Sequence, residues 1–350
     1  LYACGALGAY HRLRNADSLT VVMFHRTLAQ DDPRWALCDP DYTLEHGLFA
    51  QSLAFFARHY RVVALADVVA AQRGERRLPP RALLITFDDG WADNVDHALP
   101  ALRRAGLPAV MFVAADAVGA RQPFFQERLI SAWRRGALSL PTLARDVAEA
   151  AGSDVVHAEA ASAAQSSPRD RVPAALRALI AALEALPASV RDALLAGHAD
   201  AMDDGLRHMI DVKELAQLRA GAVEIGLHGK RHVAMTRADD LDAELGGAMA
   251  ALRGQVAASD DGVVCRTMSF PHGAFDAAIA ERAREAGYAL LFTSVPVLNA
   301  VGDGPSWLLG RTGYEADTVA DAQGRFRPER LAWYLFRRPV QHLRADAFRR

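Results

Sequence analysis

The sequence predicts an α/β protein with a parallel barrel or layered parallel sheet, because short apolar runs alternate with helical patterns. The first strand-like runs lie at residues 20–24, 62–65, 82–87 and 109–113, and helical stretches lie at 45–58 and 94–105. Strands that alternate with helices are typical of βαβ units. The alternation returns after Val212, with strands expected at 223–227, 267–270 and 289–293 and helices at 239–252 and 276–286.

Between these two halves the strand pattern stops. Residues 123–211 are rich in Ala, Leu and Arg and have the periodicity of helices, notably at 174–186 and 189–196. We interpret them as a helical insertion, with the small-residue segment 160–170 as a flexible link inside it. The expected division is therefore a barrel from residues 18–122 and 212–314, a helical insertion at 123–211 and a basic C-terminal tail at 315–350.

The tail mixes arginines with aromatic residues. Beyond Arg325 the arginines are frequent and are interleaved with Phe326, Trp333, Tyr334 and Phe336. The favoured interpretation is a helix that packs these aromatic side chains on the barrel. The other is peripheral contact with an anionic membrane surface, which basic aromatic segments also make.

Two adjacent carboxylates end one predicted strand. Residues 82–87 form a mostly apolar run, and Asp88, Asp89 and Gly90 follow it directly. Neighbouring side chains on a strand point to opposite faces, but Gly90 permits a turn at low steric cost. Both carboxylates could then reach one site at the strand end, where barrel enzymes keep their chemistry. A solvated Asp-Asp-Gly turn is the alternative that this segment alone leaves open.

Two histidines follow another predicted strand. His228 and His232 are separated by three residues directly after the apolar segment 222–227. This spacing lets two imidazole nitrogens meet one cation, although two surface histidines would give the same pattern. Together with Asp89 they would form a two-histidine, one-carboxylate site with open coordination positions, as in catalytic metal sites.

The order of these motifs resembles that of the polysaccharide deacetylases, the NodB-like proteins of carbohydrate esterase family 4. The resemblance rests on the following segments, which cover most of residues 19–122 and 212–295: 19–26, 60–65, Thr86-Phe-Asp-Asp-Gly90 with Asp93 and Asn94, 106–113, Glu224–His232 and Ser269-Phe-Pro-His-Gly273. It implies a NodB-like deformed (β/α) barrel. It also implies one divalent metal ion, with zinc as the default, and an acetylated glycan as the substrate.

The resemblance assigns roles to individual residues. Asp88 corresponds to the general base, while Asp89, His228 and His232 correspond to the metal ligands. Pro271 and His272 lie in the segment that would hold the oxyanion, through the backbone N–H of His272. The assignment agrees with general chemistry, because a divalent cation lowers the pKa of its bound water and a nearby carboxylate accepts the proton.

The sequence departs from the family pattern in two places. The third motif, usually Arg-x-Pro-Tyr, reads Ser269-Phe-Pro-His272, so the arginine that orients the base is absent there, and Arg266 is a candidate substitute. The late Leu-x-His motif that often supplies the general acid is also missing. Some members carry the acid near the start of the chain, so we assign this role to His25. A histidine that closes a strand with hydrogen bonds is the structural alternative.

Composition excludes several classes of function. The chain has 350 residues with 51% hydrophobic content, enough for a large core. Its net charge of −2, without a Gly-rich phosphate loop or basic aromatic repeats, argues against a nucleic-acid partner. Cys4, Cys38 and Cys265 are widely spaced, so neither a zinc knuckle nor a disulfide framework is expected.

Targeting signals are equally sparse. No apolar stretch reaches the length of about 18 residues that a membrane span needs. No basic segment precedes an apolar core near Leu1, so no signal peptide is visible and the compartment, cell envelope or cytoplasm, stays open.

The expected function is a metal-dependent hydrolase that removes N-acetyl or O-acetyl groups from a polysaccharide or glycan precursor. Two alternatives stay open. One is hydrolysis of another non-peptide C–N bond, such as that of a small amide or a formamido sugar-lipid. The other is a degenerate barrel that binds glycan without turnover, which the missing arginine and late histidine would explain.

Overall fold

A computed structural model of the chain describes residues 1–152, 171–255, 264–302 and 304–349. It divides into two compact units. The first comprises residues 1–27, 44–120 and 209–350, and the second comprises 28–43 and 121–208. The predicted flexible link at 160–170 lies outside the described residues.

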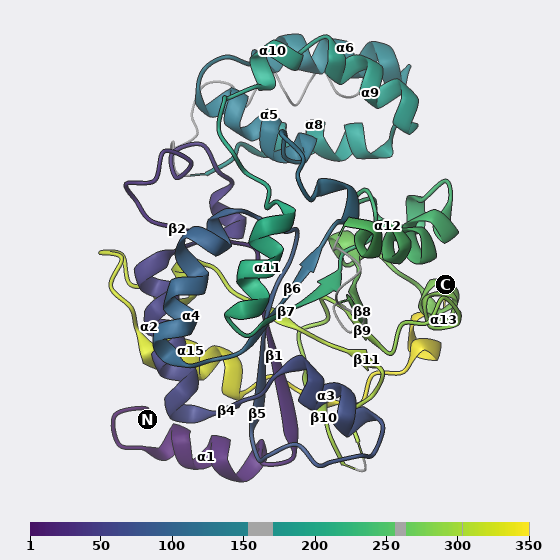
Figure 1. The fold of residues 1–350 in the computed structure, drawn as a ribbon. Coiled ribbons are helices and arrows are strands. Elements are labelled where there is room, and N and C mark those ends of the chain that lie inside the picture. The colour runs from purple at the N-terminus through teal and green to yellow at the C-terminus, as the bar shows by residue number, and fades with distance from the viewer. Residues whose placement is uncertain (153–170, 256–263, 303, 350) are drawn as a thin grey trace. The chain divides into compact units, whose positions relative to one another are not determined.

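A largely parallel sheet forms the centre of the first unit (Figure 1). The strands that carry the site are β1 (Ser18–Phe24), β5 (Ala82–Phe87), β6 (Ala109–Val113), β7 (Val223–Leu227), β8 (Val264–Ser269) and β9 (Leu290–Phe292). They lie side by side in this order, and each pairs with the next in parallel. The shorter strands are β4 (Arg61–Val62), β10 (Leu298–Ala300), β11 (Leu308–Leu309), β12 (Thr312–Gly313) and β13 (Val340–Gln341).

One short segment, residues 308–313, closes this sheet into a ring. Its first half, β11, pairs with β9, and its second half, β12, pairs with β1. The segment therefore joins the two strands that stand at opposite ends of the series from β1 to β9. The predicted NodB-like barrel is confirmed, and the ring is irregular because the closing segment offers only two residues to each neighbour.

Strands β1 and β5 are buried on both faces, as is usual for continuous apolar runs in a parallel sheet. In β1, Leu19 and Val21 belong to one hydrophobic cluster, whereas Val22 and Phe24 belong to another. All six residues of β5 are buried. This burial fixes the register of β5, so the strand end that carries Asp88 has one defined position.

Helices connect the strands of the first unit. They are α1 (Ala6–Arg14), α2 (His46–His59), α3 (Leu65–Gln72), α4 (Leu99–Ala105), α11 (Val212–Ala220), α12 (Ala248–Gln255), α13 (Ala277–Glu285), α14 (Ala316–Val319) and α15 (Pro328–Phe336). Two π-helical turns, η2 (Asn94–Ala98) and η5 (Ala243–Gly247), lead into α4 and α12. Short 3₁₀ turns are η3 (Ala115–Ala117), η4 (Met235–Arg237), η6 (Pro271–Gly273) and η7 (Ala345–Phe348).

The helix starts follow ordinary capping chemistry. The Glu45 carboxylate accepts a hydrogen bond from the Leu48 N–H at the start of α2, at 2.9 Å. The strand predicted at 62–65 is shorter than expected, because Asp67 accepts a bond from the Ala64 N–H at 3.1 Å and α3 begins at Leu65.

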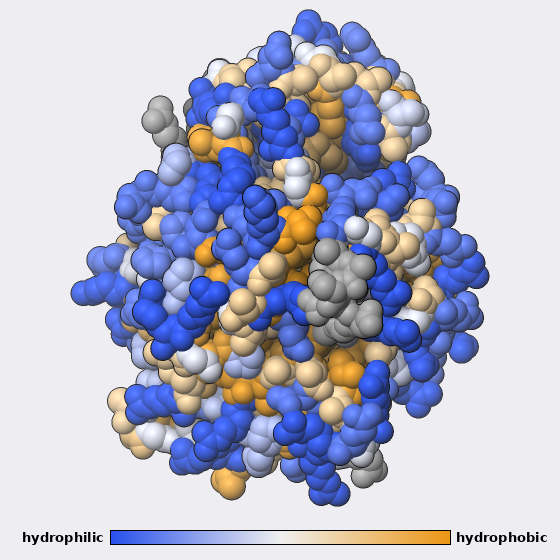
Figure 2. Space-filling view, in the orientation of Figure 1, coloured by the Kyte–Doolittle hydropathy of each residue, from blue (hydrophilic) through white to orange (hydrophobic). Residues whose placement is uncertain are grey.

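The second unit is helical. It contains η1 (Pro40–Tyr42), α5 (Phe125–Arg134), α6 (Leu140–Ala151), α8 (Ala174–Ala185), α9 (Ala188–Ala196) and α10 (Ala199–Met202). Its own core includes Leu129, Leu143, Leu176 and Leu183. On the face shown in Figure 2 its surface mixes hydrophilic and hydrophobic residues. Strands β2 (Arg26–Leu28) and β3 (Thr43–Glu45) pair in a separate two-stranded sheet.

The tail helix α15 packs on the first unit. Leu331, Leu335 and Phe336 are buried, whereas Trp333 is 51% exposed with the Arg337 guanidinium 4.0 Å from its ring. The favoured interpretation, a helix that packs on the barrel, therefore accounts for the apolar side of α15. Among the residues that the structure describes, no helix is long and apolar enough to cross a membrane.

Candidate metal centre and active site

The turn after β5 brings the two adjacent aspartates to one site. Asp89 has φ 78° and Gly90 has φ 87°, so two successive residues adopt the left-handed region. For Asp89 this conformation costs about 1–3 kcal/mol, and such strain is concentrated at functional sites. The sequence indicated the turn at Gly90 but not at Asp89. The turn places Asp88 and Asp89 on two sides of His228.

Asp89, His228 and His232 form the predicted triad. The Asp89 Oδ1 atom lies 3.3 Å from His228 Nε2 and 3.2 Å from His232 Nε2. One nitrogen or oxygen atom from each residue lies within 4.8 Å of the others, a spacing that could hold a metal ion. Asp89 Oδ1 is buried and accepts no hydrogen bond from the described residues. An acceptor-rich, buried set of this kind fits a divalent cation with two imidazole ligands and one carboxylate ligand.

Neighbouring side chains orient these three groups. The Trp91 indole N–H donates to Asp89 Oδ2 at 2.8 Å, which leaves Oδ1 to face the histidines. His228 Nδ1 lies 3.0 Å from the carbonyl oxygen of Ser269 and 2.6 Å from its hydroxyl. A carbonyl partner requires a proton on Nδ1, so Nε2 is the nitrogen free to bind a cation. Sequence patterns did not reveal the roles of Trp91 and Ser269.

The electrostatics of the triad couple metal binding to protonation. Burial lowers the pKa of His228, but the carboxylates of Asp88 and Asp89 outweigh this effect, and the pKa is raised. Burial raises the pKa of Asp89, yet His232 and His228 hold it well below its ordinary value. The two carboxylates thus favour a proton on His228, and a cation that binds this imidazole would compete with that proton.

Asp88 is held by Arg311, not by Arg266. Arg311 donates from Nη1 to Asp88 Oδ1 at 2.7 Å and from Nη2 to Asp88 Oδ2 at 2.8 Å. Arg266 is exposed, so the substitution proposed from its position in the sequence is wrong. The reason is topological: Arg311 lies between β11 and β12 on the segment that closes the barrel, 223 residues from Asp88.

The Arg311–Asp88 pair is fully enclosed. The two side chains are 1% and 2% exposed. Arg311 also donates from Nε to the Thr293 carbonyl at 3.0 Å, and the Ser269 hydroxyl donates to Asp88 Oδ1 at 3.1 Å. Burial raises the pKa of Asp88, but Arg311 and His228 outweigh it and keep the pKa below its ordinary value. Asp88 is therefore ionised and fixed in orientation.

Replacing Arg311 with Met should lower the free energy of unfolding by about 3–5 kcal/mol, because it leaves Asp88 buried without its cation. Urea denaturation at neutral pH would measure the change. Arg282→Met is the control, since Arg282 forms an exposed bidentate pair with Asp242 that solvent screens and that should contribute little to stability. Similar losses for the two variants would contradict a structural contribution of the buried pair.

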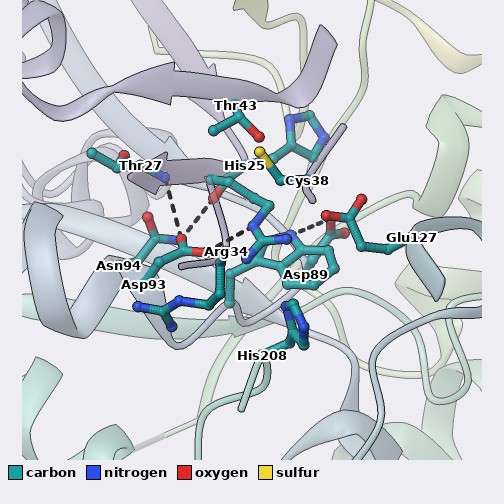
Figure 3. A network of polar contacts seen from close by, with 12 residues as sticks. His25, Thr27, Arg34, Cys38, Thr43, Asp89, Asp93, Asn94, Glu127 and His208 are labelled. Carbon is teal, nitrogen blue, oxygen red and sulfur yellow. Dashed lines mark hydrogen bonds and ion pairs between the residues drawn. The ribbon is translucent and has the colours of Figure 1, made fainter. Parts of the chain in front are cut away.

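His25 lies directly after β1, and the elements around it are held by polar contacts (Figure 3). Asn94 Nδ2 donates to the His25 carbonyl at 2.7 Å. Asp93 accepts from Arg26 Nε at 2.7 Å and from the Thr27 N–H at 3.2 Å. Burial lowers the pKa of His25, and the nearby charges of Asp89 and Asp88 oppose that effect. Burial outweighs these charges, so the pKa of His25 lies below its ordinary value, and its role as the general acid stays a prediction.

Pro271 and His272 belong to the η6 turn after β8. His272 has φ 56°, its ring lies 4.6 Å from the His232 ring, and its Nε2 lies 3.3 Å from the His232 carbonyl oxygen. The turn thus borders the triad. Together with Asp89 and His232, His272 is one of three site residues other than glycine that have positive φ.

Part of the sequence is similar to polysaccharide deacetylases. Residues 75–155 match the family model described as polysaccharide deacetylase. A segment is 31% identical over 55 residues to "Putative polysaccharide deacetylase YxkH" of Bacillus subtilis (strain 168), covering 16% of this chain and 20% of that protein. The chain thus matches about a fifth of the length of this curated relative, and the matched family segment contains Asp88 and Asp89 but neither metal-site histidine.

Solved structures share the fold over most of the chain. The deacetylase PplD of Streptococcus pyogenes, determined with acetate, has a TM-score of 0.54 at 13% identity, covering 91% of this chain and 98% of its own. IcaB from Ammonifex degensii has a TM-score of 0.55 at 17% identity, covering 91% and 97%. A polysaccharide deacetylase from Bacillus cereus has a TM-score of 0.52 at 12% identity, covering 91% and 69%. The resemblance to polysaccharide deacetylases predicted from the motifs is confirmed.

Proposed function

We propose that the protein is a metal-dependent hydrolase that removes N-acetyl groups from a polysaccharide or glycan precursor. The observation that carries the proposal is the convergence of two separate sets at one strand end. One is the buried Asp89–His228–His232 triad, and the other is the buried ion pair of Asp88 with Arg311. The similarity to polysaccharide deacetylases supports the substrate class.

Asp89, His228 and His232 would hold the cation, with zinc as the first choice for two imidazoles and a carboxylate. When bound, such an ion polarises an acyl carbonyl and lowers the pKa of a water molecule beside it. Asp88 lies next to this site, ionised and unable to rotate, because Arg311 and Ser269 occupy both its oxygens.

Two residues of the chain then carry out the proton transfers, Asp88 as the base and His25 as the acid. The oxygen of the water molecule attacks the acetyl carbonyl carbon while Asp88 accepts a proton from that water, and a tetrahedral oxyanion forms. The backbone N–H of His272 in the η6 turn stabilises the oxyanion, with Pro271 fixing the turn. The C–N bond breaks as His25 delivers a proton to the leaving nitrogen. The products are a free amine on the sugar and acetate.

The alternative of a degenerate glycan-binding barrel loses one of the two observations that supported it. It rested partly on the missing arginine, and Arg311 supplies a guanidinium to Asp88 from the segment between β11 and β12. Hydrolysis of another C–N bond, in a small amide or a formamido sugar-lipid, uses the same groups and differs only in substrate.

The direct test is an assay of the purified, zinc-loaded protein on a panel of N-acetylated oligosaccharides, O-acetylated oligosaccharides and small amides. Release of acetate together with a free sugar amine supports the proposal. Turnover of small amides alone favours the second substrate class, and metal binding without turnover of any substrate favours the binding protein.

His25→Ala should lower turnover of an N-acetyl substrate strongly, by about 10²-fold or more, because the departing amine needs a proton. Turnover of an acetyl ester with a phenolate leaving group should fall much less, since that group departs without an acid. Steady-state rates on both substrates measure the difference.

Equal losses on the two substrates would instead indicate that His25 is structural. An unaffected rate in His25→Ala, combined with a damaged His272→Ala variant, would assign the general acid to His272.

Peripheral contact of the tail with an anionic membrane also stays a prediction. It would use the exposed Trp333 with its stacked Arg337. Sedimentation with vesicles of neutral or anionic phospholipid tests it, and equal sedimentation of the wild type and Trp333→Ala would contradict it.

A further inference from the structure

The loop that joins the two metal-site histidines encloses a buried carboxylate from another element. Glu244 lies in the η5 turn and is 0% exposed. Its Oε2 atom accepts hydrogen bonds from the Lys230 N–H at 2.8 Å and from the Arg231 N–H at 3.0 Å. Its Oε1 atom accepts from Arg231 Nε at 2.6 Å. Two successive backbone N–H groups that converge on one oxygen form an anion-binding concavity.

Gly229 makes this concavity possible. Its φ of 70° is in the left-handed region, which turns the following N–H groups toward Glu244. A Cβ atom at this position would lie 3.0 Å from Met235 Cε, 3.2 Å from Pro271 Cγ and 3.3 Å from Glu244 Oε2. Glycine therefore meets two requirements here, an unusual backbone conformation and a close approach of neighbours.

The opposite edge of the loop is bound to β6 and η3. The His228 N–H donates to the Val113 carbonyl at 2.7 Å. The carbonyls of Gly229 and Lys230 accept from the N–H groups of Ala115 at 3.1 Å and Asp116 at 2.9 Å. The loop is thus fixed on one side by backbone pairing with β6 and η3, and on the other side Glu244 accepts the N–H groups of both Lys230 and Arg231.

We propose that Glu244 is a positioning residue for the metal centre. By holding the Lys230 and Arg231 amides, it sets the path of the backbone from His228 to His232, so that both imidazoles face Asp89 before any cation arrives. The inference rests on the proposed metal-dependent function. A buried carboxylate is poor evidence of stabilisation, because its desolvation offsets much of its attraction to partners. The burial of Glu244 beside the Lys230 and Arg231 amides is better explained by a role in fixing the loop between His228 and His232 than by a contribution to overall stability.

A general structural role predicts a different result, and the chain offers a matched control. Glu224 is a partly buried carboxylate on β7 that accepts a hydrogen bond from the Ala66 N–H at 3.1 Å. Like Glu244 it accepts hydrogen bonds from backbone N–H groups of another segment. It precedes the histidine loop, however, and takes no part in the hydrogen bonds that Glu244, β6 and η3 make with that loop. Glu244→Gln and Glu224→Gln therefore make the same change at different places: each removes the negative charge and one of the two acceptor oxygens that face backbone N–H groups.

The experiment measures the zinc dissociation constant by competition with a chromophoric chelator, and amide hydrogen exchange in the metal-free protein. In Glu244→Gln the dissociation constant should rise about 10- to 100-fold, the scale for removing groups that orient metal ligands. Exchange at Lys230 and Arg231 should accelerate. Glu224→Gln should leave both quantities unchanged. Arg231→Gln, which removes only the side-chain ion pair, should have a smaller effect than Glu244→Gln.

Unchanged zinc affinity and unchanged amide exchange in folded Glu244→Gln would overturn the inference. If that variant fails to fold, Gly229→Ala disturbs the same loop without removing a buried charge. Wild-type affinity in Gly229→Ala would then overturn it. A wild-type protein that binds no zinc would contradict the proposed function instead, and amide exchange in the metal-free variants would still decide whether Glu244 sets the loop.

Discussion

Replacing either His228 or His232 with Ala is expected to remove most of the bound divalent metal and to reduce hydrolysis to near the background rate. The reason is that, within the described part of the chain, three side chains would hold the cation, and a catalytic centre of this kind cannot lose one without exposing the cation to further water. Elemental analysis of the purified variants measures the metal content.

An exposed histidine supplies the control for this experiment. His342 lies in the tail and is exposed, so His342→Ala should retain full metal content and activity. Full metal occupancy in both His228→Ala and His232→Ala would remove the triad from the mechanism. Loss of metal in only one variant would identify the other histidine as a neighbour of the site instead of a ligand.

The triad could be predicted because each part sits next to a strong local signal. Strands β5, β6 and β7 have the bounds expected from their apolar runs, and in a parallel barrel their carboxyl ends meet at one face. Asp89 directly follows the Asp at the end of β5, and His228 directly follows β7. Strand order and the position after a strand were therefore enough to bring these side chains together.

Arg311 could not be predicted in the same way. It follows β11, a two-residue strand with no periodicity, and its partner Asp88 lies 223 residues away. The pairing depends on how residues 308–313 bridge β9 and β1, and a local pattern does not encode that closure. Arg266 was closer in sequence to the third motif, but its side chain is exposed.

The supporting groups Trp91, Ser269 and Glu244 were missed for a related reason. Each acts through a hydrogen bond to another residue of the site, so its residue type carries no chemical signature of its own. The assignment of residues 28–43 to the helical unit was likewise not visible in the sequence. That unit depends on contacts such as those of Arg177 with Asp39 and Asp41, which are distant along the chain.

Replacing Asp88 with Asn should keep the metal and lower turnover by about 10²- to 10⁴-fold, the range for losing general acid–base help. The amide has nearly the same shape and still offers one oxygen to Arg311, but it cannot accept the proton of the attacking water. The Asp89–His228–His232 triad keeps all three of its ligand atoms. Metal content and the rate on an N-acetylated oligosaccharide are measured on the same preparation.

The comparison with Asp89→Asn makes this experiment decisive, because the two adjacent aspartates differ in every contact. Asp88 binds Arg311 with both oxygens, whereas Asp89 turns one oxygen to Trp91 and the other to the two histidines. Asp89→Asn should therefore lose metal together with activity, and added zinc should restore part of both. If Asp88→Asn loses the metal and Asp89→Asn retains it, the roles of the two carboxylates are reversed. If both variants retain metal and activity, neither Asp88 nor Asp89 takes part in the reaction. The ion pair between Arg311 and Asp88 would then serve only to close the barrel.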